Sequence, residues 1–447
     1  MASRPTYPFD VRSADVWKIA LPASVAFITE PMVGIVDITV IGRLGDAALL
    51  GGLVLGAIVF DFIFALAYFL RLGTAGLTAQ SVGARDPKDG LMHVVRAIGL
   101  AVIIGLAMIV LSSALLWVSV VTLQPEPAVE VALAEYFQVR LLSAPFSLIN
   151  YALLGWFYGR AAARTGMLLQ LLIHGVNIAL SIAFVYGLHW GVAGAAAGTV
   201  AGHVVAALIG LYLVARHYGG FRATLEKIVP AELVDPVALR RMFGLSRDLM
   251  IRWGALMSAY AYFAAQGSRA GEITLASNAI LLNMMMVSAF FLDGLAQASE
   301  QLCGKAVGAN WRPAFERATS LALTAGIAIS TGLALVLYFG GPVIIDLMTT
   351  SEPVREAARH YLWLAALCAI TGMPAFVYDG ILTGATLNGA MRNGMLVSLV
   401  LFLGAALVMQ QTMGNAGLWV ALNLFFLARA GIYWWSLERR KPALFAA

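Results

Sequence analysis

Long apolar stretches recur along almost the whole chain, and they constrain the fold more than any other feature. A helix needs about 20 mostly apolar residues to cross a hydrocarbon core of about 30 Å. Charged residues make up only 12% of the sequence, whereas soluble domains carry about 25%. We therefore predict an all-α integral membrane protein. Twelve transmembrane helices can be placed, at residues 16–42, 48–80, 91–121, 131–158, 164–187, 191–216, 242–267, 274–304, 315–348, 356–384, 393–412 and 416–437.

One long polar connection divides these helices into two sets of six. We expect an N-terminal lobe at residues 1–217, a cytoplasmic connector at 218–241 and a C-terminal lobe at 242–447. A shift of 225 residues superimposes Gly42 on Gly267 and Gly155 on Gly380, which indicates an internal repeat. Because six helices return the chain to the same side, the two lobes should be related by a parallel pseudo-twofold repeat, with the substrate path between them.

Basic residues in the loops predict the orientation. With both termini and the connector in the cytoplasm, 21 basic residues lie on that side and four lie outside. The positive-inside rule favours this arrangement. The four outer residues are Arg43, Arg269, Arg355 and Arg359, and four further arginines (Arg71, Arg140, Arg252 and Arg429) lie within predicted helices.

Ionisable residues inside predicted spans are functional candidates, because their burial in a membrane is costly. The predicted helices contain six acids but only four arginines, so at least two carboxylates lack a permanent basic partner. A proton carrier needs such a carboxylate. These acids are Glu30, Asp37, Asp61, Asp293, Glu300 and Asp379.

The first predicted helix carries the strongest candidate, Asp37. Glu30 lies seven residues earlier, two turns away on nearly the same face. We assign Glu30 to the same cation-coupling site, as a relay residue for the proton, and its alternative role is an ion pair with Arg71 or Arg140. Pro22 and Pro31 interrupt this helix, and each favours a bend because proline cannot donate a backbone hydrogen bond.

The C-terminal half has different polar residues. Asp293 and Glu300 are seven residues apart in one span, and Asp379 lies in the middle of another. We assign them to a substrate cavity, together with Arg252, Tyr260 and Met284. For Asp379, a salt bridge with Arg252 or Arg429 is the competing interpretation.

Signatures of other classes of protein are absent from the sequence. It contains no zinc-protease, serine-hydrolase, P-loop or dinucleotide-binding motif. The two cysteines lack metal-ligand spacing, and no basic run interleaved with aromatics indicates nucleic-acid binding. We therefore expect no enzyme activity, no cofactor, no metal site and no nucleic-acid partner, and an ion gradient as the energy source.

Several motifs resemble the multidrug and toxic compound extrusion (MATE) family, and its DinF-like branch in particular. They lie between residues 15 and 437, in the order found in that branch. The motifs are Ala20-Leu21-Pro22, Glu30-Pro31-Met32-Val33-Gly34-Ile35-Val36-Asp37, Gly76-Leu77-Thr78-Ala79-Gln80, Leu142-Ser143-Ala144-Pro145, Leu292-Asp293-Gly294 and Asp379-Gly380.

The resemblance implies cation-coupled export of small organic compounds, often aromatic or cationic, from a bacterial inner membrane. Asp37 matches the family's coupling aspartate and Pro22 its bending proline. Asn177 and Thr199 match further members of that site, whereas Ser181 replaces an aspartate found in many relatives. The segment from Trp253 to Gln266 lacks the acid of the sodium-coupled branch, which favours protons.

Three other interpretations remain open at this stage. The chain could be a sodium-coupled exporter, a flippase for a lipid-linked saccharide of the same superfamily, or a membrane enzyme or passive channel. A flippase should have more cationic residues in its cavity, and an enzyme should have a catalytic motif. We expect a monomer whose partners are small-molecule drugs or metabolites, protons and membrane lipids.

The predicted orientation can be tested by labelling single cysteines on intact cells. In a background lacking Cys303 and Cys368, Gln124→Cys should react with a membrane-impermeant maleimide, because its loop is outside. Glu226→Cys should react only after the cells are permeabilised. The opposite pattern would show that the orientation is reversed.

Overall fold

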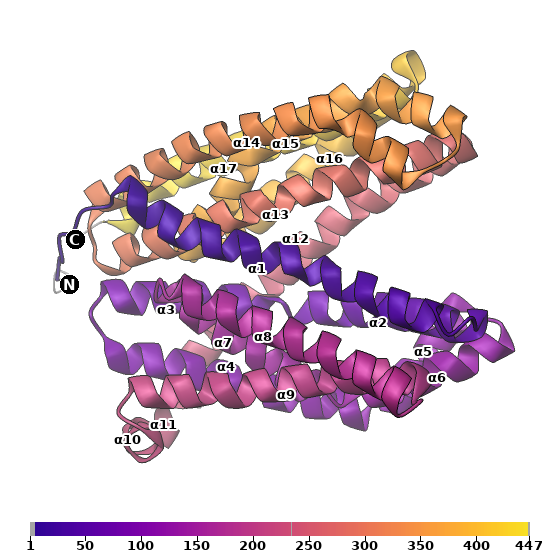
Figure 1. The fold of residues 1–447 in the computed structure, drawn as a ribbon. Helices are drawn as coiled ribbons and strands as arrows, with labels where there is room; N and C mark the ends of the chain where they lie inside the picture. Colours follow the sequence, from indigo (N-terminus) through magenta and orange to yellow (C-terminus); the bar gives the residue numbers. More distant parts are fainter. Residues whose placement is uncertain (1–4, 234, 446–447) are drawn as a thin grey trace. The chain divides into compact units, whose positions relative to one another are not determined.

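The computed structural model describes residues 5–233 and 235–445 and is shown in Figure 1. All regular structure within these residues is helical, with seventeen α-helices and one short π-helical turn. This agrees with the all-α prediction.

The helices form two compact units. Unit 1 comprises Met1–Phe27, Ala79–Arg85 and Phe243–Ala447, and unit 2 comprises Ile28–Thr78 and Asp86–Met242. Three helices, α1 (Ser13–Gly42), α3 (Phe69–Gly83) and α12 (Pro236–Arg269), therefore contribute residues to both units.

Unit 2 contains the remaining helices of the first half of the chain. Within it α8 packs along α9, α4 along α7, and α2 along α6. The bounds are α2 (Ala47–Ala67), α4 (Pro87–Val110), α5 (Ser112–Leu123), α6 (Pro127–Leu141), α7 (Ala144–Gly159), α8 (Ala163–Ile182), η1 (Ala183–Gly187), α9 (Gly191–His217), α10 (Phe221–Lys227) and α11 (Pro230–Leu233).

Unit 1 contains the longest helices, and in Figure 1 α14, α15 and α17 run beside one another. Its apolar core includes Phe263 stacked edge-on against Trp419, with ring centroids 4.9 Å apart. Buried amides of Asn278 and Asn415 exchange hydrogen bonds of 2.8 and 2.9 Å. The helices are α12 (Pro236–Arg269, of which Phe243 onward belongs to unit 1), α13 (Glu272–Gly308), α14 (Arg312–Met348), α15 (Glu352–Gly384), α16 (Asn388–Met413) and α17 (Asn415–Leu444).

Helix length and composition largely agree with the predicted spans. Among the described residues, ten helical stretches are long and apolar enough to cross a membrane, and α6 with α7 makes an eleventh that is bent by 51°. The remaining predicted span, 242–267, lies within α12. That helix is 34 residues long, but Arg252, Gln266 and its tyrosines make it less apolar.

Three predicted spans are interrupted. The span at 48–80 consists of α2 and α3, the span at 91–121 is broken at Leu111, and the span at 131–158 is broken at residues 142–143. The third break precedes Pro145, near the start of α7, where proline is accepted because helix-starting N–H groups lack partners anyway. The predicted connector also contains two short helices, α10 and α11.

Helix α1 runs from Ser13 to Gly42 without a break in its assignment, although it contains Pro22 and Pro31. Pro31 cannot donate to the carbonyl of Phe27, four residues before it. The boundary between the two units crosses α1 directly after Phe27. The helix therefore changes unit at the turn from which a backbone hydrogen bond is missing.

The approach of α8 to α9 depends on small residues. A Cβ atom added at Gly198 would lie 2.6 Å from the backbone nitrogen of Ser181, and one at Gly202 would lie 2.5 Å from the carbonyl oxygen of Ile173. Small residues spaced by four allow membrane helices to pack this closely. Gly175 on α8 has no such neighbour within 4 Å.

We expect Gly198→Ala to lower stability, because the added methyl group forces α8 and α9 apart. The cost should be about 1–3 kcal/mol, as for other overpacked sites. The measurement is thermal unfolding of the purified protein in detergent. Gly175→Ala, on the facing helix, is the matched control and should unfold at or above the wild-type temperature. If the two variants unfold at the same temperature, the packing argument is wrong.

Candidate functional site

Asp37 lies in the part of α1 that belongs to unit 2, with only 7% of its surface exposed. Its Oδ1 atom is buried and has no hydrogen-bond partner within the described part of the chain. The Ser181 side chain of α8 lies within hydrogen-bonding reach of the carboxylate, and Arg140 of α6 acts on it electrostatically. Asp37 thus combines burial with an unused acceptor atom.

A chain of hydrogen bonds continues from Ser181 into α8 and α9. The Ser181 hydroxyl lies 3.0 Å from Asn177 Oδ1 and 3.2 Å from the Ala195 carbonyl oxygen, and can donate to either. Asn177 Nδ2 donates to Thr199 Oγ1 at 3.0 Å. Thr199 in turn donates to the same Ala195 carbonyl at 3.2 Å. We call Asp37, Ser181, Asn177 and Thr199 the Asp37 network.

All four members of the Asp37 network are buried. Asn177 and Ser181 are four residues apart on α8, so they lie one turn apart on one face. The close contact at Gly198 brings Thr199 against that face. The structure therefore brings together the four residues that the family resemblance assigned to one site.

Glu30 lies apart from this network. It has an exposed side chain two turns before Asp37, and Arg71 and Asp61 act on it electrostatically. Arg71 itself is buried against the rings of Tyr68 and Tyr158, at 5.3 and 5.0 Å from their centroids. Of the two basic partners considered for Glu30, Arg71 is the one that acts on it.

Arg140 interacts with several acids and rings of unit 2. Its guanidinium donates to the Ser143 hydroxyl at 2.6 Å and lies 5.4 Å from the centroid of the Phe60 ring. It also acts electrostatically on both Asp37 and Asp61. The positive charge of Arg140 is therefore shared, and it does not form a dedicated ion pair with Asp37.

Two histidines, His174 and His203, add polar groups near the network. On α8, His174 Nδ1 lies 3.0 Å from the Thr29 hydroxyl of α1. On α9, His203 contacts the buried Asn150 of α7, whose amide donates to the His203 carbonyl at 2.9 Å. An asparagine amid the apolar residues of span 131–158 was the available signal for Asn150.

In unit 1, Asp379 binds both arginines that were considered for it. Arg252 Nη1 lies 3.3 Å from Asp379 Oδ2, and Arg429 Nη2 lies 3.1 Å from the same oxygen. The three side chains come from α12, α15 and α17. We call them the Arg–Asp–Arg cluster.

The other residues assigned to the substrate cavity lie in different surroundings. Glu300 is buried and accepts from Gln297 Nε2 at 3.0 Å. Asp293 is half-buried on α13 and, like Arg429, acts electrostatically on Tyr260. Met284 lies in the apolar core of unit 1, and Tyr260 packs against that core. The charges of Asp293 and of Arg429, a member of the Arg–Asp–Arg cluster, thus both act on the Tyr260 side chain.

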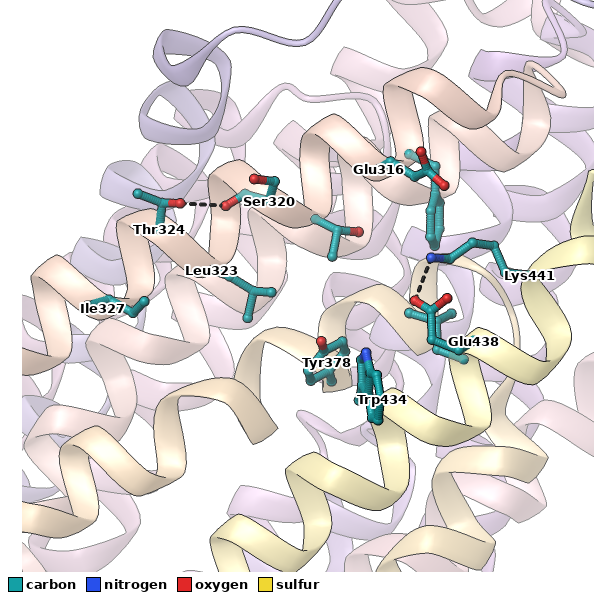
Figure 2. Close-up of a pocket in the computed structure, with 12 residues that line it drawn as sticks. Glu316, Ser320, Leu323, Thr324, Ile327, Tyr378, Trp434, Glu438 and Lys441 are labelled. Atoms are coloured by element: carbon teal, nitrogen blue, oxygen red, sulfur yellow. Dashed lines mark hydrogen bonds and ion pairs between the residues drawn. The ribbon is translucent and has the colours of Figure 1, made fainter.

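A pocket of about 340 Å³ opens elsewhere in unit 1, between α14, α15 and α17 (Figure 2). Lys441 and Glu438 form an ion pair of 2.5 Å at one end, and Trp434 and Tyr378 lie beside it. Glu316 also lines the pocket, and it pairs with Arg312 at 2.8 Å. None of the predicted site residues lines this pocket, and no motif in the sequence indicates it.

Metal ligation has no candidate in the described residues, 5–233 and 235–445. No group of three or more His, Cys, Asp or Glu side chains is placed there to hold a metal ion. Both cysteines, Cys303 and Cys368, are buried as free thiols.

Comparison with known proteins extends these observations. The MatE family model matches residues 22–185 and 256–410. DNA damage-inducible protein F of Escherichia coli is 33% identical over 422 residues, which cover 93% of this chain and 89% of that protein. A probable multidrug resistance protein NorM of Burkholderia mallei is 26% identical, with 99% and 96% of the two chains covered.

Solved structures show the same fold. An outward-facing multidrug resistance MATE family transporter of the MOP superfamily superposes with a TM-score of 0.87 at 21% identity, covering 97% of both chains. A MATE structure in the bent conformation gives 0.86, also at 21% identity, with 98% and 99% covered. These similarities confirm the predicted twelve-helix fold class. From the family match and the extent of identity to the Escherichia coli protein, the chain belongs to the MatE family and is a multi-span membrane transporter of the MATE type, not an enzyme.

Proposed function

We propose that this transporter is a secondary antiporter that exports small organic compounds in exchange for protons, and that Asp37 carries the proton. The observation that supports this most is the position of Asp37, buried with a free acceptor oxygen beside a hydroxyl that can reverse its role. The names of its relatives, which include a probable multidrug resistance protein, support drug-like compounds as cargo.

The Asp37 network suits a group that alternates between two protonation states. When Asp37 is ionised, the Ser181 hydroxyl can donate to the carboxylate. When Asp37 is protonated, the acid can donate to Ser181 Oγ, while the Ser181 hydrogen turns to Asn177 Oδ1 or the Ala195 carbonyl, at 3.0 and 3.2 Å. A hydroxyl both donates and accepts, so neither state leaves a buried polar group of Ser181 unsatisfied.

The same geometry favours protons over sodium. A sodium site needs several oxygen atoms directed at one point, as other oxygen-ligated cations do. In the network these oxygens already accept hydrogen bonds: Asn177 Oδ1 from Ser181, Thr199 Oγ1 from Asn177, and the Ala195 carbonyl from Thr199. In addition, α12 has no acid between Trp253 and Gln266.

The energy available to one proton is sufficient for this task. An elementary charge that enters across about 100 mV releases about 2.3 kcal/mol. Since about 1.4 kcal/mol corresponds to a tenfold concentration ratio, one proton per cycle supports accumulation of roughly 50-fold.

We place the protein in the bacterial inner membrane as a monomer, with both termini in the cytoplasm.

Asp37→Asn is the decisive variant, because it keeps the shape of the side chain but cannot titrate. In proteoliposomes, transport of a fluorescent dye driven by an imposed pH gradient should fall at least about tenfold, to the background of empty vesicles. Glu30→Gln should have a smaller effect, since Glu30 is exposed and interacts with Arg71. Glu130→Gln, an exposed acid of the same unit, is the control and should transport normally.

Two results would overturn this proposal. Full pH-driven transport by Asp37→Asn would make Asp37 a structural residue. Transport by the wild type under a sodium gradient at equal pH on both sides, with none under a pH gradient, would identify sodium as the coupling ion.

A further inference from the structure

The Arg–Asp–Arg cluster of unit 1 has more buried donors than its carboxylate uses. Both guanidinium groups contact one oxygen, Asp379 Oδ2. Asp379 Oδ1 and the Nε atoms of Arg252 and Arg429 are buried and have no hydrogen-bond partner in the described residues. Arg429 is 1% exposed and Arg252 is 7% exposed.

Burying these unpaired polar atoms lowers the stability of the protein unless another group binds to them. Two guanidinium groups and one carboxylate carry a net charge of +1, and an incompletely paired buried charge destabilises the protein. Arginine is also the residue best suited to bind planar anions, through two parallel hydrogen bonds. The unused Nε donors fit that mode of binding.

The surroundings of Arg429 add an apolar surface to this charge. Its guanidinium lies 5.3 Å from the centroid of the Phe376 ring, 5.7 Å from that of Phe426 and 5.9 Å from that of Tyr433. The buried Tyr433 hydroxyl lies within hydrogen-bonding reach of the Asp379 carboxylate and adds a further donor to the cluster. Asp379 is the most accessible member of the cluster, with 15% of its side chain exposed.

We infer that the Arg–Asp–Arg cluster is a binding site for the anionic group of an aromatic amphiphile, a carboxylate, sulfonate or phosphate. In the empty site Asp379 holds both arginines. A bound anion shares or replaces that carboxylate, and the neighbouring rings contact its apolar part. This inference rests on the proposed function, because it adds anionic compounds to the class of exported substrates.

Asp379 and the anion compete for the same two guanidinium groups. Removing the charge of Asp379 should therefore strengthen anion binding, whereas removing either arginine should weaken it. Opposite effects from two members of one cluster are not expected if the cluster is only structural, since every change would then simply destabilise the unit.

A pair of probes that differ in one charge tests the site. Dansylglycine carries a carboxylate, and its methyl ester is uncharged. Binding to the purified protein in neutral detergent is followed by dansyl fluorescence. We expect the wild type to bind dansylglycine about tenfold more tightly than the ester, the range of one charge-assisted hydrogen bond.

The variants should change this charge preference in opposite directions. Arg429→Gln and Arg252→Gln should reduce it to less than about threefold, and Asp379→Asn should increase it by about tenfold or less. Arg429→Lys keeps the charge and should retain part of the preference if Arg429→Gln proves too unstable to purify. Arg439→Gln is the matched control, because Arg439 also lies over an aromatic ring, that of Trp435 at 4.1 Å, but is exposed.

Equal affinity of the wild type for the two probes would overturn the inference without any variant. So would a loss of preference in Arg439→Gln equal to that in Arg429→Gln. Competition by benzoate identifies a soluble organic anion as the ligand, and competition only by phosphatidylglycerol, not phosphatidylcholine, identifies a lipid phosphate. The assay needs no ion gradient, so its failure is distinct from a failure of proton coupling through Asp37.

Discussion

The cost of placing an unpaired polar group in a hydrocarbon environment governs this structure. In a membrane, backbone groups are satisfied within each helix, so side chains must supply every polar contact between helices. The two units meet this requirement in different ways. In unit 2, Asp37 lies beside neutral groups that can donate or accept, and the charge of Arg140 acts on it without forming a dedicated ion pair. In unit 1, Asp379 is held by two permanent positive charges.

These two solutions have different chemical consequences. A carboxylate beside a hydroxyl and an amide can gain or lose a proton without disrupting its neighbours. A carboxylate between two arginines is held by two opposite charges, which an incoming anion can share or take over. Asp37 is therefore suited to titration, and Asp379 is suited to act as a replaceable counter-anion. The two halves of the sequence have different polar residues, and in the structure these residues form two different kinds of site.

The positions of the helices depend on hydrophobicity and could be predicted from the sequence. The contacts between side chains depend on how each helix is rotated about its axis, and fewer of them could be predicted. Apolar runs were sufficient for the helices, but the break at Leu111 and the bend before Pro145 depend on local packing. Membership of Asp37, Asn177 and Thr199 in one site was available only through family resemblance. The choice of Arg252 or Arg429 for Asp379 stayed open because a sequence gives the position of a residue along its helix and not the neighbour it faces. The pocket beside Trp434 had no signal at all, since its residues come from three helices and share no motif.

Helix α1 belongs to unit 1 up to Phe27 and to unit 2 from Ile28 onward, and Asp37 lies ten residues beyond that boundary, a distance of about 15 Å along the helix axis. A displacement of one unit against the other involves every helix that crosses the boundary, and in α1 it can be accommodated at the turn where Pro31 removes a backbone hydrogen bond. Asp37, which we propose as the proton carrier, lies beyond that turn, in the part of α1 that belongs to unit 2. The proposed proton site and the turn at which the helix can bend most easily therefore belong to one helix, so that a change at either can act on the other.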